Sequence, residues 1–111
     1  MMTRTQMLLQ KLQEELAESI VEASKCQNFG LHETYGNATY NQAQLSNVQR
    51  LRRELLDVVA VCDMLEDEPA GVPRLLERDD EAITAKRSKV ETYLRYSQTL
   101  GIMEKTRRVH R

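Results

Sequence analysis

Three stretches of the chain repeat apolar side chains with the period of an α-helix. They run from about Thr5 to Asn28, from about Asn47 to Glu66 and from about Asp80 to Leu100. No segment alternates cleanly between apolar and polar residues, as a half-buried strand would. The pattern therefore predicts an all-α fold.

The apolar positions of the first stretch share one arc of a helical wheel, which predicts its buried face. They are Leu8, Leu9, Leu12, Leu16, Ile20 and Ala23. The second stretch opens with a capping box of Ser46 and Gln49 and is apolar nearly all round from Leu55 to Cys62. A helix of that kind is usually covered on several sides. We therefore expect a homodimer or a larger even-numbered assembly such as a homotetramer.

Turn-forming residues mark the ends of the stretches. Gly30 is expected to stop the first, Asp79 or Asp80 to cap the third, and Gly101 to end it. Between the second and third stretches, the segment Arg74–Glu77 is expected to make a short helical turn.

The remaining segments are a long loop and a basic tail. About 17 residues, Gln27 to Ala43, connect the first two stretches, and a connection that long in a small domain is often functional. We expect one domain over residues 1–101, followed by a basic tail over residues 102–111.

Composition narrows the class of protein. The 111 residues suffice for one domain, and 41% hydrophobic and 30% charged residues are typical of soluble globular proteins. A net charge of −1 gives no general attraction for nucleic acid, and no apolar run is long enough to span a bilayer. Two cysteines are too few for a disulfide framework or a zinc site, so a cytoplasmic location is expected.

Two pairs of acidic residues carry the candidate chemistry. Glu15 and Glu18 lie three apart in the first stretch, and Glu54 and Asp57 lie three apart in the second. Residues three apart share a helix face, so the two acidic edges can meet if the helices pack together. Four converging carboxylates repel one another unless a cation lies among them, and Mg²⁺ favours such oxygen ligands.

Asp57 is the most informative of these acids because it interrupts an apolar run, and an unpaired buried carboxylate is costly. The alternative is ordinary, since acidic pairs on a helix surface are commonly solvated or paired with Lys or Arg. Lys25, Lys86 and Lys89 could neutralise phosphate oxygens, or could equally be ordinary solvated lysines.

These residues resemble the ExxE…ExxD signature of the MazG-like nucleotide pyrophosphohydrolases, which belong to the all-α NTP pyrophosphatase group. The motif resides in Glu14–Glu18 and Glu54–Asp57, and the segments Ala23–Leu31 and Ala85–Leu94 look like the small phage and bacterial members. The resemblance covers most of Leu8 to Leu94. The loop between the acidic pairs is longer than in compact MazG domains, which leaves substrate choice open.

The resemblance implies a four-helix-bundle-like fold, homo-oligomers, and dependence on Mg²⁺ or Mn²⁺. It implies hydrolysis of an NTP or dNTP to its monophosphate and pyrophosphate. Carried over residue by residue, Glu15, Glu18, Glu54 and Asp57 would bind the metal, with Glu15 or Glu18 as the base. The three lysines would hold the phosphate chain.

The long loop could bind the base of the nucleotide by stacking and hydrogen bonding. Its candidate residues are Phe29, Tyr35, Asn37 and Asn41, with His32 and Tyr40 beside them. The main rival interpretation is a non-enzymatic helical interaction protein that retains the fold. Nucleic-acid binding through the basic tail is a third, although such tails are commonly only solubilising.

Overall fold

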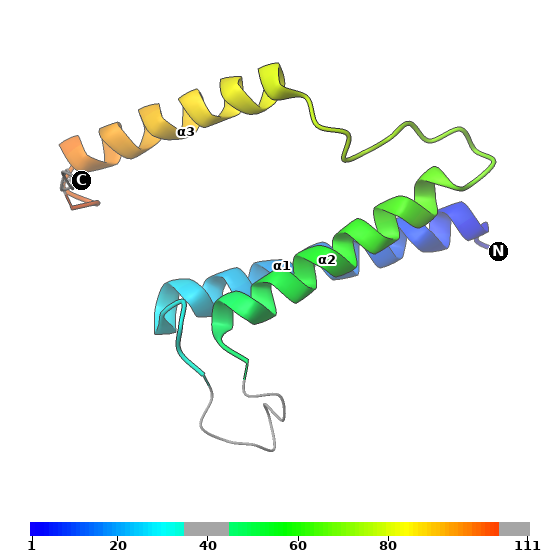
Figure 1. Cartoon of the computed structure of the whole chain (residues 1–111), viewed down its shortest axis with the longest axis horizontal. Coiled ribbons are helices and arrows are strands. Elements are labelled where there is room, and N and C mark those ends of the chain that lie inside the picture. Colours follow the sequence, from blue (N-terminus) through cyan, green and yellow to red (C-terminus); the bar gives the residue numbers. More distant parts are fainter. Residues whose placement is uncertain (35–44, 105–111) are drawn as a thin grey trace. The chain divides into compact units, whose positions relative to one another are not determined.

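The computed structural model describes residues 1–34 and 45–104, and most of them are helical. Helix α1 spans Arg4–Phe29, α2 spans Asn47–Glu66 and α3 spans Asp80–Thr99 (Figure 1). No strand forms in these two ranges. The prediction of an all-α fold is confirmed, and the three predicted helices agree with the observed bounds to within one residue at each end.

Each helix begins at a residue whose side chain caps the first turn. Ser46 and Gln49 form the predicted capping box of α2, in which the Ser46 hydroxyl accepts from the Gln49 backbone N–H at 3.3 Å. The Asp79 carboxylate accepts from a backbone N–H of the first turn of α3 at 3.0 Å, as predicted. A second capping box, between Thr3 and Gln6, starts α1 and was not recognised in the sequence.

Two of the helices end at glycines with backbone conformations that favour this residue. Gly30 has φ 102° and donates its N–H to the Cys26 carbonyl at 3.0 Å, which ends α1 as predicted. Gly101, at φ 74°, follows Leu100 just past the end of α3. A side chain at either glycine would strain the backbone, so both positions help to fix where the helices stop.

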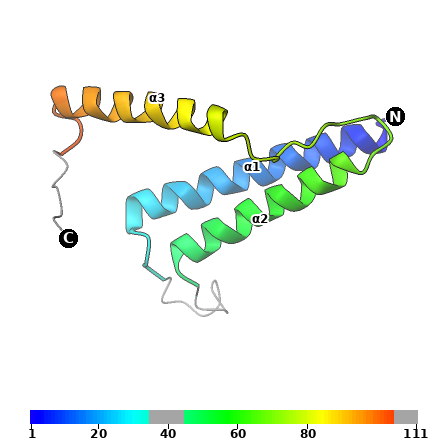
Figure 2. The same ribbon diagram turned by 45° about the horizontal axis from the view of Figure 1, so that its top comes forward.

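The first compact unit of the structure, Met1–Leu76, is an antiparallel hairpin of α1 and α2. The two helices lie side by side along their length in both views (Figures 1 and 2). The apolar core of the hairpin lies near the start of α1 and the end of α2. It consists of Leu8, Val61 and Leu65, with Leu12 and Val72 packed against them.

Backbone hydrogen bonds hold the other end of the hairpin together, where the long loop begins and ends. The Asn47 N–H donates to the Glu33 carbonyl and the Val48 N–H to the Leu31 carbonyl, both at 2.9 Å. The Asn47 side-chain amide also donates to the Gly30 carbonyl at 2.9 Å. The start of α2 is therefore fixed against the chain that leaves α1.

The face of α1 that is buried differs from the predicted one. The buried residues of α1 are Leu8, Glu15, Ser19 and Cys26. Leu16 and Ile20, which the apolar arc placed in the core, are 45% and 70% exposed. The buried positions are spaced seven, four and seven apart, which is the spacing of a helix packed along one line of contact. The prediction was correct for Leu8 and Leu12 and wrong for Leu16 and Ile20, because this line runs beside the apolar arc rather than through it.

The second unit, Glu77–Arg111, contains α3. The segment Arg74–Glu77, where a short helical turn was expected, contains a turn at Leu75 and Leu76 and no helix. So few residues after Pro73 cannot offset the cost of starting a helix. The single domain over residues 1–101 stays a prediction, and most of the basic tail lies outside the described residues.

Two coarse expectations from composition can be compared with the structure. Cys26 and Cys62 are both free thiols and both buried, in keeping with the absence of a disulfide framework. Among the described helices, none combines the length and the apolar character needed to cross a membrane.

Candidate metal site

Three acidic side chains meet across the packed faces of α1 and α2. One carboxylate oxygen each from Glu15, Glu54 and Asp57 lies within 4.8 Å of the other two. Glu15 is buried, Glu54 is half-buried and Asp57 is exposed. The cluster therefore reaches from the interior of the hairpin to its surface. We call Glu15, Glu54 and Asp57 the acidic cluster.

Two oxygens of the acidic cluster are buried without a hydrogen-bond partner in the described part of the chain. They are Oε2 of Glu15 and Oε2 of Glu54. A buried carboxylate oxygen without a donor is costly, and native structures keep few such groups without a reason. A hydrogen-bond donor or a cation at these two oxygens would offset that cost.

The register of the antiparallel helices explains why these acids meet. The core contacts between Leu8 and Leu65 set the register near one end of the hairpin. Two turns along α1 from Leu8, Glu15 then faces the middle of α2. Glu54 and Asp57, three residues apart, present their carboxylates to the same side there.

Glu18 is the fourth predicted acid, and it acts on the cluster without belonging to it. Burial raises the pKa of Glu54, and the neighbouring Glu18 carboxyl raises it further. The charges of Asp57 and Glu15 add to the same effect. All four predicted acids therefore influence one carboxyl, and the site disfavours full ionisation unless a cation is bound.

Asp57 is not buried, contrary to the interpretation of its place in an apolar run. It is exposed, since it lies at the margin of α2 that borders α1. The apolar residues around it in the sequence, including Leu55 and Leu56, project from another side of the helix and are also largely exposed. Solvent can therefore reach the acidic cluster at Asp57.

Lys11 is a neighbour of the site that the sequence interpretation missed. Its Nζ lies 3.3 Å from Oε1 of Glu15 and 3.3 Å from Oε2 of Glu14. Hydrogen bonds and charge from Glu15 and Glu14 raise the pKa of Lys11. The spacing of four residues from Lys11 to Glu15 was the available signal.

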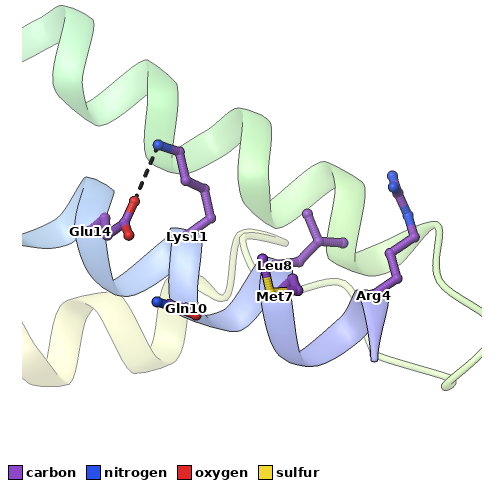
Figure 3. Close-up of a pocket in the computed structure, with 6 residues that line it drawn as sticks. All are labelled: Arg4, Met7, Leu8, Gln10, Lys11 and Glu14. Carbon is purple, nitrogen blue, oxygen red and sulfur yellow. Dashed lines mark hydrogen bonds and ion pairs between the residues drawn. The ribbon is translucent and has the colours of Figure 1, made fainter. Parts of the chain in front are cut away.

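Lys11 also lies on a shallow groove along α1. Figure 3 shows the ion pair with Glu14 and the other side chains of this groove. The groove has a volume of about 330 Å³ and is lined by Arg4, Met7, Leu8, Gln10, Lys11 and Glu14. One face of Lys11 thus borders open space while its ammonium group reaches the acids.

The three predicted phosphate-binding lysines have different surroundings. Lys25 is half-buried and pairs with Glu22, with Nζ 3.3 Å from Oε1. Lys86 and Lys89 lie on α3, in the other unit, and both are exposed. A role of the three in phosphate binding stays a prediction.

The predicted base-binding residues are only partly described. Phe29 is the last residue of α1 and is 62% exposed, and His32 is exposed in the turn that follows. Tyr35, Asn37 and Asn41, with Tyr40 beside them, lie outside the described residues. Their part in binding a base stays a prediction.

Polar residues continue along the packed faces beyond the acidic cluster. Ser19 is buried and donates its hydroxyl to the Glu15 carbonyl at 2.9 Å. Oε2 of Glu22 and Oδ1 of Asn47 are buried and have no hydrogen-bond partner in the described ranges. The spacing of Glu15, Ser19 and Glu22 between Leu8 and Cys26 was the available signal for this polar line. A search for the apolar face of a helix does not detect it, because these three residues are polar.

The donor set suits a hard divalent cation. Every group of the acidic cluster offers a carboxylate oxygen, the ligand type that Mg²⁺ and Mn²⁺ prefer. The two unpaired buried oxygens are the independent feature that separates this cluster from ordinary surface acids. Because Asp57 is exposed, a cation held there could keep waters or substrate oxygens in its coordination sphere.

Comparison of the chain with family models, with curated proteins and with solved structures finds no match in any of the three.

Proposed function

We propose that this protein is a Mg²⁺-dependent nucleoside triphosphate pyrophosphohydrolase, which cleaves an NTP or dNTP to its monophosphate and pyrophosphate. The observation that carries the proposal is the acidic cluster with its two unpaired buried oxygens. The resemblance of Glu15, Glu18, Glu54 and Asp57 to the ExxE…ExxD signature supports the choice of substrate and reaction.

Three residues of the cluster would hold the cation, Glu15 and Glu54 from the interior and Asp57 from the surface. A divalent cation bound there supplies charge neutralisation for the phosphate oxygens. Glu18 is the better of the two candidate bases because it is exposed and adjoins Glu54 without belonging to the cluster. It would accept a proton from the water that attacks the α-phosphorus, and pyrophosphate would leave.

The remaining substrate contacts rest on the resemblance. Lys25, on the same helix as Glu18, would neutralise phosphate oxygens together with Lys86 and Lys89. The loop after α1, from Phe29 onward, would hold the base through Tyr35, Asn37 and Asn41. We further propose a cytoplasmic homodimer or homotetramer with a four-helix-bundle-like fold, since the outer face of α2 is too apolar for a lone hairpin.

A non-enzymatic helical interaction protein is the second candidate function. The exposed apolar side chains on the outer face of α2 favour it, because large exposed apolar patches commonly mark interaction sites. An interaction protein has no need of three carboxylates gathered between two helices with two buried, unpaired oxygens, so we place hydrolysis first.

Hydrolysis of a nucleotide panel tests the proposal. The full chain is incubated with Mg²⁺ and each NTP and dNTP in ¹⁸O-labelled water, and the products are separated and identified by mass. We expect a monophosphate that carries the label, together with unlabelled pyrophosphate. Label in orthophosphate with a diphosphate as co-product refutes attack at the α-phosphorus, and no turnover of any nucleotide refutes the proposed activity.

Matched variants connect the activity to the site. Asp57→Asn should abolish turnover while the protein keeps its helical circular dichroism. Glu14→Gln is the control, because Glu14 adjoins Glu15 in the sequence but is exposed and points to Lys11. An Asp57→Asn variant that folds and retains the wild-type rate would show that the site is assigned to the wrong residues.

A further inference from the structure

An apolar groove follows the side of α2 that faces away from α1. It has a volume of about 230 Å³ and is lined by Val48, Leu51, Arg52, Leu55, Leu56 and Val59. Leu55 and Leu56 are 48% and 46% exposed, although leucines at the middle of a helix are usually buried. A contiguous apolar surface of this kind is typical of an interaction site.

The charges on α2 are arranged from one end to the other. The first two turns carry Arg50, Arg52 and Arg53, and the second half carries Asp57, Asp63 and Glu66. This order opposes the helix dipole, which favours acids near the N-terminus and bases near the C-terminus. An antiparallel neighbour of the same sequence would place each basic half beside an acidic half.

We propose that the groove is the contact surface between two copies of this chain, with the α2 helices antiparallel. The twofold axis passes near Leu55 and Leu56, close to the middle of Asn47–Glu66. This proposal rests on the proposed homodimer and deepens it, because it names a surface and a register, and it does not depend on catalysis.

The register predicts one pair of charges, formed twice by symmetry. Arg52 and Asp63 are eleven residues apart, which places them about 20° apart on the helical wheel and on the groove side of α2. In an antiparallel pair centred near Leu56, Arg52 lies level with the partner subunit's Ala60, and the partner subunit's Asp63 lies about one helical turn from that level. A long helical side chain also leans toward the N-terminus of its own helix, which brings the guanidinium closer to that acid.

Sedimentation velocity of the full chain tests this surface through a charge exchange. The wild type should be a dimer at micromolar concentration, and Arg52→Glu or Asp63→Arg alone should each raise the dissociation constant roughly tenfold or more. The double variant Arg52→Glu/Asp63→Arg should return to within about threefold of the wild type. Arg53→Glu is the matched control, because Arg53 projects about 100° away from Arg52, off the groove.

A second variant keeps the test decisive. Leu55→Asp should yield a folded monomer, because Leu55 is half-exposed on the hairpin and outside its core. A wild-type monomer overturns the proposal and assigns the groove to another part of this chain or to another protein. A dimer that Arg52→Glu and Leu55→Asp leave intact, or that the double variant fails to restore, overturns it equally.

Discussion

The ammonium nitrogen of Lys11 lies 3.3 Å from Oε1 of Glu15, one helical turn away on α1. Oε2 of the same carboxylate is buried and has no hydrogen-bond partner in the described residues. Glu15 is therefore compensated on one side only. The lysine neutralises part of its charge, and the proposed cation would compensate the other oxygen.

Lys11 should compete with a cation for Glu15. Removal of its charge in Lys11→Gln makes the cluster more negative, so we expect Mg²⁺ to bind roughly three- to tenfold more tightly. Isothermal titration of the full chain with Mg²⁺ measures the affinity at low ionic strength. Arg4→Gln is the control, because Arg4 pairs with Glu68 far from the cluster. Equal affinities of Lys11→Gln and the wild type would mean that Mg²⁺ does not bind at Glu15.

Mg²⁺ or Mn²⁺ should stabilise the fold, because a bound cation relieves the repulsion among the carboxylates of the native state. At a concentration about a hundred times the dissociation constant the gain is about 2.7 kcal/mol, which raises the Tm by roughly 10 °C or more for a small domain. Thermal melts with and without the metal measure the shift. The double variant Glu54→Gln/Asp57→Asn should lose it, and a shift that persists unchanged in this variant would place the metal elsewhere.

Without metal, Glu54 should make stability depend on pH. Its folded-state pKa is raised above the ordinary value of 4.5, so the folded chain holds this proton more tightly than the unfolded chain. The stability from the bound proton is present below about pH 4.5 and is lost as the pH rises from there through the raised pKa.

The variant Glu54→Gln removes this dependence. In chelator-treated protein, its Tm should match the wild type in acid and exceed it at pH 7. Melts across the pH range, with Glu91→Gln on α3 as an exposed control, give the difference directly. If the difference between Glu54→Gln and the wild type is the same at every pH, Glu54 does not titrate as its surroundings indicate.

Local signals in the sequence predicted the helices well. Ser46, Gln49 and Asp79 are recognisable because capping depends on residues only three apart, and Gly30 because few other residues adopt its backbone conformation. The meeting of Glu15 with Glu54 and Asp57 also followed from spacing, once the two helices were assumed to pack together.

The choice of buried face could not be predicted in the same way. Leu16 and Ile20 are more apolar than Glu15 and Ser19, yet they are the exposed ones in the hairpin. A helical wheel ranks faces by hydrophobicity, whereas burial depends on which neighbour covers each face. The polar line of Glu15, Ser19 and Glu22 is a case in which local pattern and packing disagree, and such disagreements are common at functional sites of proteins.

The polar line also predicts a difference between two glutamates seven residues apart. Glu15 and Glu22 each keep a buried oxygen without a hydrogen-bond partner in the described ranges, so replacement of either by leucine should stabilise the metal-free fold by about 1–3 kcal/mol. Chemical denaturation in the presence of a chelator measures this gain.

The two leucine variants should differ in their effect on hydrolysis. Glu15→Leu removes a ligand of the proposed cation and should abolish hydrolysis, whereas Glu22→Leu only releases Lys25 from its ion pair and should retain it. Such a gain of stability at the expense of function is characteristic of residues kept for chemistry rather than for folding. If Glu22→Leu is as inactive as Glu15→Leu, the functional site extends along the polar line, and if both remain active, the acidic cluster has no part in catalysis.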